Sequence, residues 1–260
     1  MRRVLRVLPA VLLLVALIGA WELYVDLGGV DPLVLSAPHE VAKAIYNDRT
    51  LLWDNFLVTA QEVLLGILVA AVVGLALAIG IHFSQTLRRA VYPLLVASQA
   101  VPIPILAPIL VFWLGFGILP KLVVIALVSF FSIVVTTLAG LAAVDPDLIK
   151  LMRTFDATRL RTFRHVELPS ALPGVFTGSR IAVAVAVIGA VLGEQTGGSA
   201  SANPGLGFQI NLSLNQSLTA RGIAAVVILS LFAIALFGLL TLAERLAVPW
   251  AYQSRGALSS

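Results

Sequence analysis

The 260-residue sequence contains no cysteine and few charged residues. The missing cysteine excludes a disulfide framework, a thiolate metal site and a cysteine nucleophile. Only 12% of the residues are Asp, Glu, Lys or Arg, against roughly a quarter in soluble domains, while 60% are hydrophobic. Together with a mean hydropathy of +1.02, this composition predicts an all-α integral membrane protein.

Motifs for catalysis are missing as well. No stretch matches the phosphate-binding loop G-x-x-x-x-G-K-[ST], so this chain should not bind or hydrolyse ATP by that route. No Gly-x-Ser-x-Gly elbow occurs. His39, His82 and His165 are far apart and lie at different predicted depths, which argues against a shared metal. We therefore expect no catalytic residue, no metal and no cofactor in this chain.

Six apolar segments are long enough to cross a bilayer, which takes about 20 residues in a helix. They cover residues 4–25, 57–83, 91–112, 122–144, 174–193 and 222–243. Residues 1–56 are expected to hold the first span and an outer segment with a short surface helix near 38–45. Residues 57–260 would form a five-helix core.

The distribution of basic residues predicts the orientation. A net charge of +4 could suggest nucleic acid, but the preference of Lys and Arg for the cytoplasmic side explains it without such a partner. With both termini in the cytoplasm, only Lys43, Arg49, Lys121 and Arg221 of the 17 basic residues lie outside. The other thirteen are Arg2, Arg3, Arg6, Arg88, Arg89, Lys150, Arg153, Arg159, Arg161, Arg164, Arg180, Arg245 and Arg255. We expect a multi-pass protein of the inner (cytoplasmic) membrane, in contact with lipid.

The third span is interrupted by proline. Residues 90–120 carry no charge but five prolines, two of them within 101–105, so the helix is expected to break near 101–108. Irregular backbone at membrane depth is tolerated only inside protein or beside a water-filled cavity. Gln99, Pro102 and Pro104 are therefore candidates for a translocation path, although a kinked packing helix is the alternative.

Other polar residues allow two interpretations. Ser129, Ser132 and Thr136 share one helical face, and they either line a path or bond their own backbone or a neighbouring helix. Glu194, like Glu62, lies near the outer end of its span, where it either lines a path or is interfacial and paired. Neither glutamate forms the mid-membrane relay of a proton pump.

Small residues recur every fourth position in the second span. They are Gly66, Ala70, Gly74 and Ala78. Small residues let helix backbones approach closely in membranes, so this ridge predicts helix packing.

The loop at residues 145–173 is the one long polar segment between apolar ones in the second half of the chain. Apolar residues at helical spacing predict two short helices, with Asp156 as the N-cap of the second at 157–167. Leu168-Pro169 should end that helix. The loop either rests on anionic headgroups or offers a docking surface to a cytoplasmic partner.

The segment 152–159, Met-Arg-Thr-Phe-Asp-Ala-Thr-Arg, followed by Leu168-Pro169 and Ala171-Leu172-Pro173, resembles the cytoplasmic signature of ABC importer permeases. The chain departs from the signature where the family glycine falls on Asp156, and where the acidic and two alanine positions fall on 150–152. Other segments are similar to the branch that takes up nitrate, sulfonates, taurine and thiamine pyrimidines. These are residues 35–38, 99–104, 115–117, 193–194, 205–207, 244–245 and 249–250.

The resemblance implies a type I ABC importer permease fold of about six helices and a set of partners. A second permease subunit, expected to be another copy, would complete the path. A dimer of cytoplasmic ATPase subunits would bind ATP and Mg, and an extracytoplasmic binding protein would deliver the solute. The implied ATPase-docking residues are Met152, Arg153, Phe155, Asp156, Ala157, Thr158, Arg159, Leu168 and Pro169.

The solute stays open at this point. A thiamine-pyrimidine precursor is the expectation from the resemblance, with sulfonate, taurine or nitrate as the alternative. Outside this family, a self-contained secondary transporter or channel is the competing class.

Overall fold

The computed structural model describes residues 2–197 and 204–250, and every regular element within those ranges is helical. The first helices are α1 (Arg2–Gly28), α2 (Pro38–Asn47), α3 (Arg49–Phe83), α4 (Gln85–Ser98), α5 (Ile103–Leu114) and α6 (Ile118–Ala142). They are followed by α7 (Pro146–Thr154), α8 (Arg159–Thr162), a π-helical turn (Phe163–Glu167), α9 (Leu168–Gly197), α10 (Leu206–Asn215) and α11 (Thr219–Ala247). Within these ranges, five helices are long and apolar enough to cross a membrane, or six if the bent pair α4–α5 counts as one span. The predicted all-α membrane fold is confirmed.

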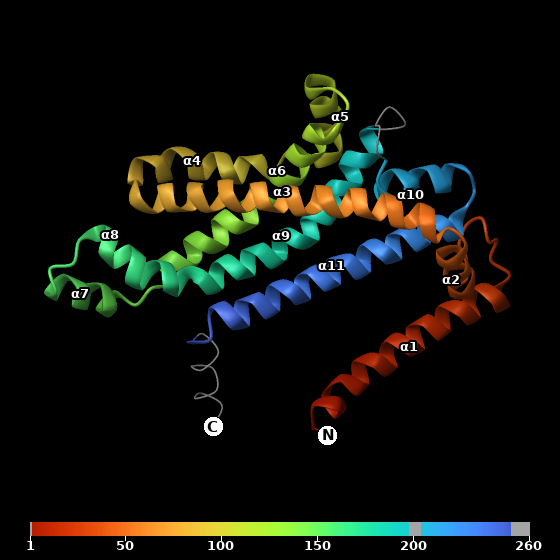
Figure 1. Ribbon diagram of the computed structural model, residues 1–260, viewed down its shortest axis with the longest axis horizontal. Helices are drawn as coiled ribbons and strands as arrows, with labels where there is room; N and C mark the ends of the chain where they lie inside the picture. The colour runs from red at the N-terminus through yellow and green to blue at the C-terminus, as the bar shows by residue number, and fades with distance from the viewer. Residues whose placement is uncertain (1, 198–203, 251–260) are drawn as a thin grey trace.

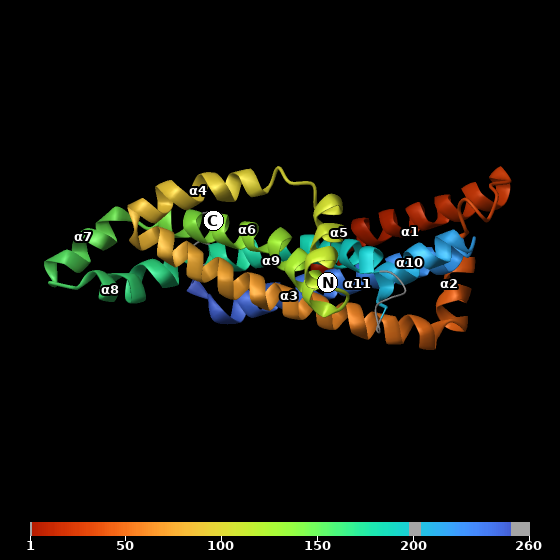
Figure 2. The same cartoon turned by 90° about the horizontal axis from the view of Figure 1, so that it is seen from above.

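The long helices α3, α6, α9 and α11 form the body of the molecule (Figure 1). At one end α7 and α8 project beyond the body, and we call this the loop end. At the other end α2 and α10 cover the tips of the long helices, and we call this the α10 end. Helix α1 reaches the bundle beside α2 and otherwise leaves its apolar surface exposed (Figures 1 and 2).

The tightest packing joins α6 to α9, because small residues let the two backbones meet. A Cβ added at Gly174 would lie 2.6 Å from the carbonyl oxygen of Thr136, and one at Gly178 would lie 2.8 Å from that of Ser132. Along α3, the ridge of Gly66, Ala70, Gly74 and Ala78 is buried. Its two glycines lie against isoleucines of α6. Two stripes of small residues thus hold α6 between α3 and α9.

Helix α3 begins eight residues before the start expected at residue 57, and its 35 residues span about 52 Å. That exceeds the roughly 30 Å of the hydrocarbon core, so the polar first turns need not enter lipid. The polar side chains there find partners instead, as Asn55 Nδ2 donates to the carbonyl oxygen of Leu51 at 2.7 Å. The polar composition of this segment therefore did not exclude a helix. The division of the chain at residue 56 stays a prediction.

The break in the third span lies at residues 99–102, between α4 and α5, and the two helices meet at 103°. The expected break is confirmed, but it begins two residues early and bends the chain far more than a kink. Pro104 lies in the first turn of α5, where its missing N–H costs nothing. Pro102 is the residue before the helix, so the end of the bend is set by these two prolines.

Candidate functional site

The loop end is built from two short helices that expose their apolar side chains. Asp145 caps α7 by accepting from the backbone N–H of Asp147 at 2.8 Å, and no residue of α7 is buried. Phe155 and Leu160 are 71% and 68% exposed, beside several arginines. Since Phe155 lies outside the candidate membrane spans, its exposure favours a surface that a partner covers.

The turn between α7 and α8 depends on Asp156, but not as an N-cap. Asp156 has a φ of +51°, its N–H donates to the carbonyl of Arg153 at 3.0 Å, and the N–H of Ala157 donates to that of Met152 at 3.1 Å. This pair of hydrogen bonds is the Schellman motif, whose left-handed residue is usually glycine. The N-cap of α8 is Thr158, whose hydroxyl accepts from Arg161 N. The predicted cap was therefore wrong, and the left-handed backbone explains why the family pattern has glycine here.

The prediction that Leu168-Pro169 ends the second helix was also wrong. Helix α8 runs through the π-turn, in which Leu168 N–H bonds the carbonyl of Phe163, directly into α9. Pro169 lies in the first turn of α9, and the wider π-turn before it accommodates a residue without an N–H. The loop is consequently continuous with a helix of 30 residues.

Contacts to the end of α3 hold the loop in place. His82 Nε2 lies 2.8 Å from Glu167 Oε2, and Phe83 packs on Phe163 with ring centroids 4.9 Å apart. The guanidinium of Arg159 donates to the carbonyl of His82 at 3.3 Å and lies over the Phe83 ring. Arg159 therefore faces α3, whereas the Phe155 side chain is exposed.

The candidate path residues do not gather in one place. Gln99, Pro102 and Pro104 lie exposed at the α4–α5 bend. Ser129 instead lies between α6 and α9, where its hydroxyl donates to the carbonyl of Ala182 at 3.4 Å. Thr136 donates to the carbonyl oxygen of Ser132 at 2.7 Å, within its own helix. These hydroxyls follow the interpretation of bonds to backbone and a neighbouring helix, and a role in translocation stays a prediction.

A buried polar cluster near the α10 end joins α3, α6 and α9. Lys121 Nζ donates to Glu62 Oε1 at 2.7 Å, and the two side chains are 3% and 4% exposed. Glu194, which is 1% exposed, accepts from Thr59 Oγ1 at 2.6 Å and from the backbone N–H of Gly207 at 2.5 Å. Thr59 Oγ1 in turn accepts from the N–H of Leu206 at 2.8 Å. This geometry favours an anchor for the start of α10 over a path-lining role for Glu194.

The glycines beside Glu194 are required by this contact. A Cβ on Gly205 would overlap the carboxylate of Glu194, and one on Gly207 would lie 2.7 Å from Val191 Cα. The sequence showed Glu62 and Glu194 near span ends and Lys121 at the start of another span. It did not show that the three meet, because their helices are far apart in the chain.

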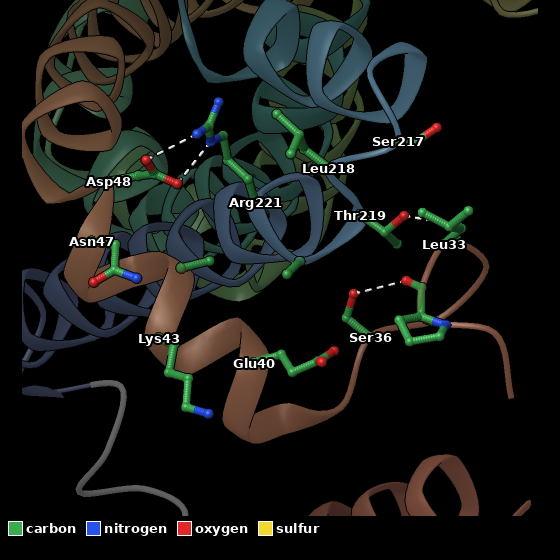
Figure 3. Close-up of a pocket in the computed structure, with 13 residues that line it drawn as sticks. Leu33, Ser36, Glu40, Lys43, Asn47, Asp48, Ser217, Leu218, Thr219 and Arg221 are labelled. Atoms are coloured by element: carbon green, nitrogen blue, oxygen red, sulfur yellow. Dashed lines mark hydrogen bonds and ion pairs between the residues drawn. The ribbon is translucent and has the colours of Figure 1, made fainter. Parts of the chain in front are cut away.

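A hollow of about 400 Å³ lies at the tip of the α10 end, between the segment around α2 and the start of α11 (Figure 3). Arg221 donates to both carboxylate oxygens of Asp48, at 2.7 and 3.0 Å. Thr219 Oγ1 donates to the carbonyl oxygen of Leu33 at 2.6 Å. Glu40 and Lys43 add one charge of each sign to the rim. Two segments far apart in sequence thus form one fixed, polar surface.

Comparison with known proteins finds a matching family model and several similar permeases. A family model described as binding-protein-dependent transport system inner membrane component matches residues 62–247. The formylaminopyrimidine transport permease protein ThiX of Halalkalibacterium halodurans is 35% identical over 251 residues, covering 96% of this chain and 98% of that protein. The riboflavin transport system permease protein RibX of Chloroflexus aurantiacus is 34% identical, covering 94% and 89%. The taurine permease TauC of Escherichia coli is 28% identical, covering 91% and 87%.

Solved structures with the same fold include two transporters. An amino acid ABC transporter crystallised with histidines superposes with a TM-score of 0.60 at 17% identity, covering 77% of this chain and 96% of that one. An inward-facing MetNI methionine ABC transporter gives a TM-score of 0.58 at 22% identity, covering 73% and 91%. At 17% and 22% identity, these two structures support the fold of the chain and nothing about its solute.

Proposed function

Because the chain belongs to the family of binding-protein-dependent transport system inner membrane components, we propose that it imports a small heterocyclic solute of the formylaminopyrimidine type. It is a multi-pass protein of the cell membrane and a permease subunit of an ABC transporter. The main support for this solute is the 35% identity to the formylaminopyrimidine permease over nearly the whole of both chains.

The energy source in this proposal is a separate ATPase that docks at the loop end. The supporting features are the missing phosphate-binding loop in this sequence and the exposed Phe155 and Leu160. The loop end is then cytoplasmic, as the excess of basic residues there favours. A second permease subunit completes the path, and a homodimer is the simplest assembly.

Helix α9 connects the docking loop to the opposite side of the membrane. It continues from α8 without a break, extends about 45 Å to Gly197, and carries Glu194, which binds the start of α10. A movement imposed on the loop is passed along a rigid helix instead of being absorbed by a flexible hinge. The hollow between α2 and α11 lies at the far end, and there we place the extracytoplasmic binding protein.

Riboflavin is the second candidate solute, because RibX is 34% identical over a similar length. Both relatives are named for nitrogen heterocycles, whereas taurine and sulfonate permeases are 27–28% identical. We therefore rank the aliphatic sulfonates, and the nitrate considered with them, lower.

The test is uptake by proteoliposomes that contain the permease, its ATPase and the binding protein. Labelled formylaminopyrimidine should accumulate only with ATP inside, and unlabelled riboflavin or taurine should compete poorly. Accumulation of riboflavin or taurine instead would overturn the proposed solute but not the transporter class. Uptake by the permease alone, without ATPase, would overturn the ATP-driven mechanism and favour a self-contained secondary transporter or channel.

A further inference from the structure

Two adjoining hollows lie at the loop end, against the first turns of α4. One, of about 320 Å³, is enclosed by the ends of α3 and α6 and by Arg159. The other, of about 530 Å³, follows α4 past Arg89 and Tyr92. Gln85 and Arg88 line both, so the two hollows lie side by side, and together we call them the α4 hollow.

The α4 hollow is strongly basic. Arg88, Arg89 and Arg159 line it, and no carboxylate is among the described residues that do so. The guanidinium groups of Arg88 and Arg89 form no ion pair or hydrogen bond with any side chain in the described part of the chain. Arg159 is held by the His82 carbonyl and the Phe83 ring. Three arginines therefore line the two adjoining hollows, with Arg88 common to both, and no carboxylate stands among the described residues that line them.

The position of the α4 hollow indicates which anion it fits. Its inner wall is the apolar last turn of α6, with Leu138, Leu141 and Ala142, so it lies where the spanning helices end. Beyond Arg89, the same face of helix α4 carries Tyr92 and Val96, which are 42% and 52% exposed. A charged depression thus adjoins an uncovered apolar strip. A soluble anion would contact only the arginines, whereas a phospholipid would contact the arginines with its headgroup and the apolar strip with its acyl chains.

We propose that the α4 hollow binds the phosphate headgroup of an anionic phospholipid, with the acyl chains along α4. Arginine suits this ligand, because its planar guanidinium can donate two parallel hydrogen bonds to phosphate oxygens. Basic pockets between helices at a membrane surface are a known way of binding such headgroups. Phe155 does not line this site, although Arg159 belongs to the implied docking residues, and the site does not depend on the proposed solute.

The test compares two double variants that each remove two exposed arginines from the loop end. Arg88→Gln/Arg89→Gln removes two of the three arginines that line the hollow, and Arg161→Gln/Arg164→Gln is the matched control outside it. The purified full chain, in detergent, is exposed to phosphatidylglycerol or phosphatidylcholine, and retained lipids are counted by native mass spectrometry. Inorganic phosphate is added as a competitor in a further arm.

The wild type and the control should retain phosphatidylglycerol in preference to phosphatidylcholine. The hollow variant should lose that preference by about tenfold or more, since each arginine near an anionic headgroup contributes several-fold. Equal losses in both variants would mean diffuse attraction and would overturn a defined site. Displacement of the lipid by dilute inorganic phosphate would overturn the lipid as the source of the anion.

A third result would also count against the proposal. If the hollow variant kept its lipid but lost co-purification with the ATPase, the arginines would belong to a protein interface. Equal melting temperatures of both variants in phosphatidylcholine should show that neither pair of substitutions disturbs the fold.

Discussion

The two ends of the bundle differ in which side chains they bury: one buries charged residues, and the other exposes apolar residues. Near the α10 end, Glu62, Lys121 and Glu194 are withdrawn from solvent and bonded to each other's helices. At the loop end, Phe155 is exposed outside the candidate membrane spans, and Leu160 is exposed at the start of α8. A buried charge is tolerated only with a partner, and an exposed apolar cluster is best explained by one. The first end has its partners within the chain, and the second offers an exposed surface for the ATPase that we propose to dock there.

This contrast separates internal cohesion from assembly. Substitutions in the buried polar cluster should lower the stability of the permease itself. Substitutions on the exposed loop should leave stability unchanged and reduce coupling to the ATPase. The predictions below test this separation, starting with the largest expected effect.

Lys121→Met should destabilise the chain by about 3–5 kcal/mol, because it leaves the carboxylate of Glu62 buried without its cation. The measurement is thermal denaturation of the purified permease in detergent. The double variant Glu62→Leu/Lys121→Met removes both charges and should recover most of the loss. Equal destabilisation in the double variant would show that side-chain packing, not the uncompensated charge, was responsible.

Gly205→Ala should cost roughly 1.5–3 kcal/mol, the value of a hydrogen bond to a charged group. The added Cβ overlaps the Glu194 carboxylate and forces it away from Thr59 or Gly207. Gly238→Ala is the matched control, since nothing lies within 4 Å of a Cβ there. The control should gain about 0.5–1 kcal/mol from the better helix propensity. Similar melting temperatures for the two variants would rule out the close contact.

Phe155→Ala should weaken ATPase binding by about 2 kcal/mol, or roughly thirtyfold, if Phe155 is an anchor of the docking surface. Its 71% exposure means that the melting temperature of the free permease should not change. Phe116→Ala, at a residue 64% exposed in the turn before α6, should leave ATPase binding intact. Wild-type affinity in the Phe155 variant would remove it from the docking surface.

Asp156→Gly should have the smallest effect and should stabilise by up to about 1 kcal/mol, because it removes the strain of a left-handed residue. Asp156→Val should instead destabilise, since a β-branched residue fits this conformation poorly. Transport by the glycine variant should equal that of the wild type. A severe loss of transport in that variant would mean that the carboxylate makes a specific contact with the ATPase.

Local sequence signals predicted the helices well and their ends poorly. The apolar segments predicted the long helices, and the prolines predicted the break between α4 and α5. The start of α3 was missed because polar residues are compatible with a helix that extends past the bilayer. The prediction that Leu168-Pro169 ends the second helix of the loop was wrong, because Pro169 lies in the first turn of α9, where proline is tolerated.

Asp156 shows which part of a residue's role can be predicted from a sequence motif and which part cannot. Its position relative to the family glycine was visible in the sequence, and so was its tolerance of left-handed backbone. The two hydrogen bonds that make it the end of α7, and not the start of α8, depend on coordinates. An aspartate suits either role, so the residue type alone could not decide between them.

The sequence by itself determined that this protein lies in the membrane, that it is helical, that it has a basic loop with a family signature, and that it lacks an ATP-binding motif. Hydropathy, proline and charge are properties of short segments, and these conclusions follow from them. Only the tertiary structure joined Glu62, Lys121 and Glu194, turned Arg159 toward α3 and placed Arg88 in the hollow that Arg159 lines. Such contacts join residues tens of positions apart, and their geometry is set by how the helices pack.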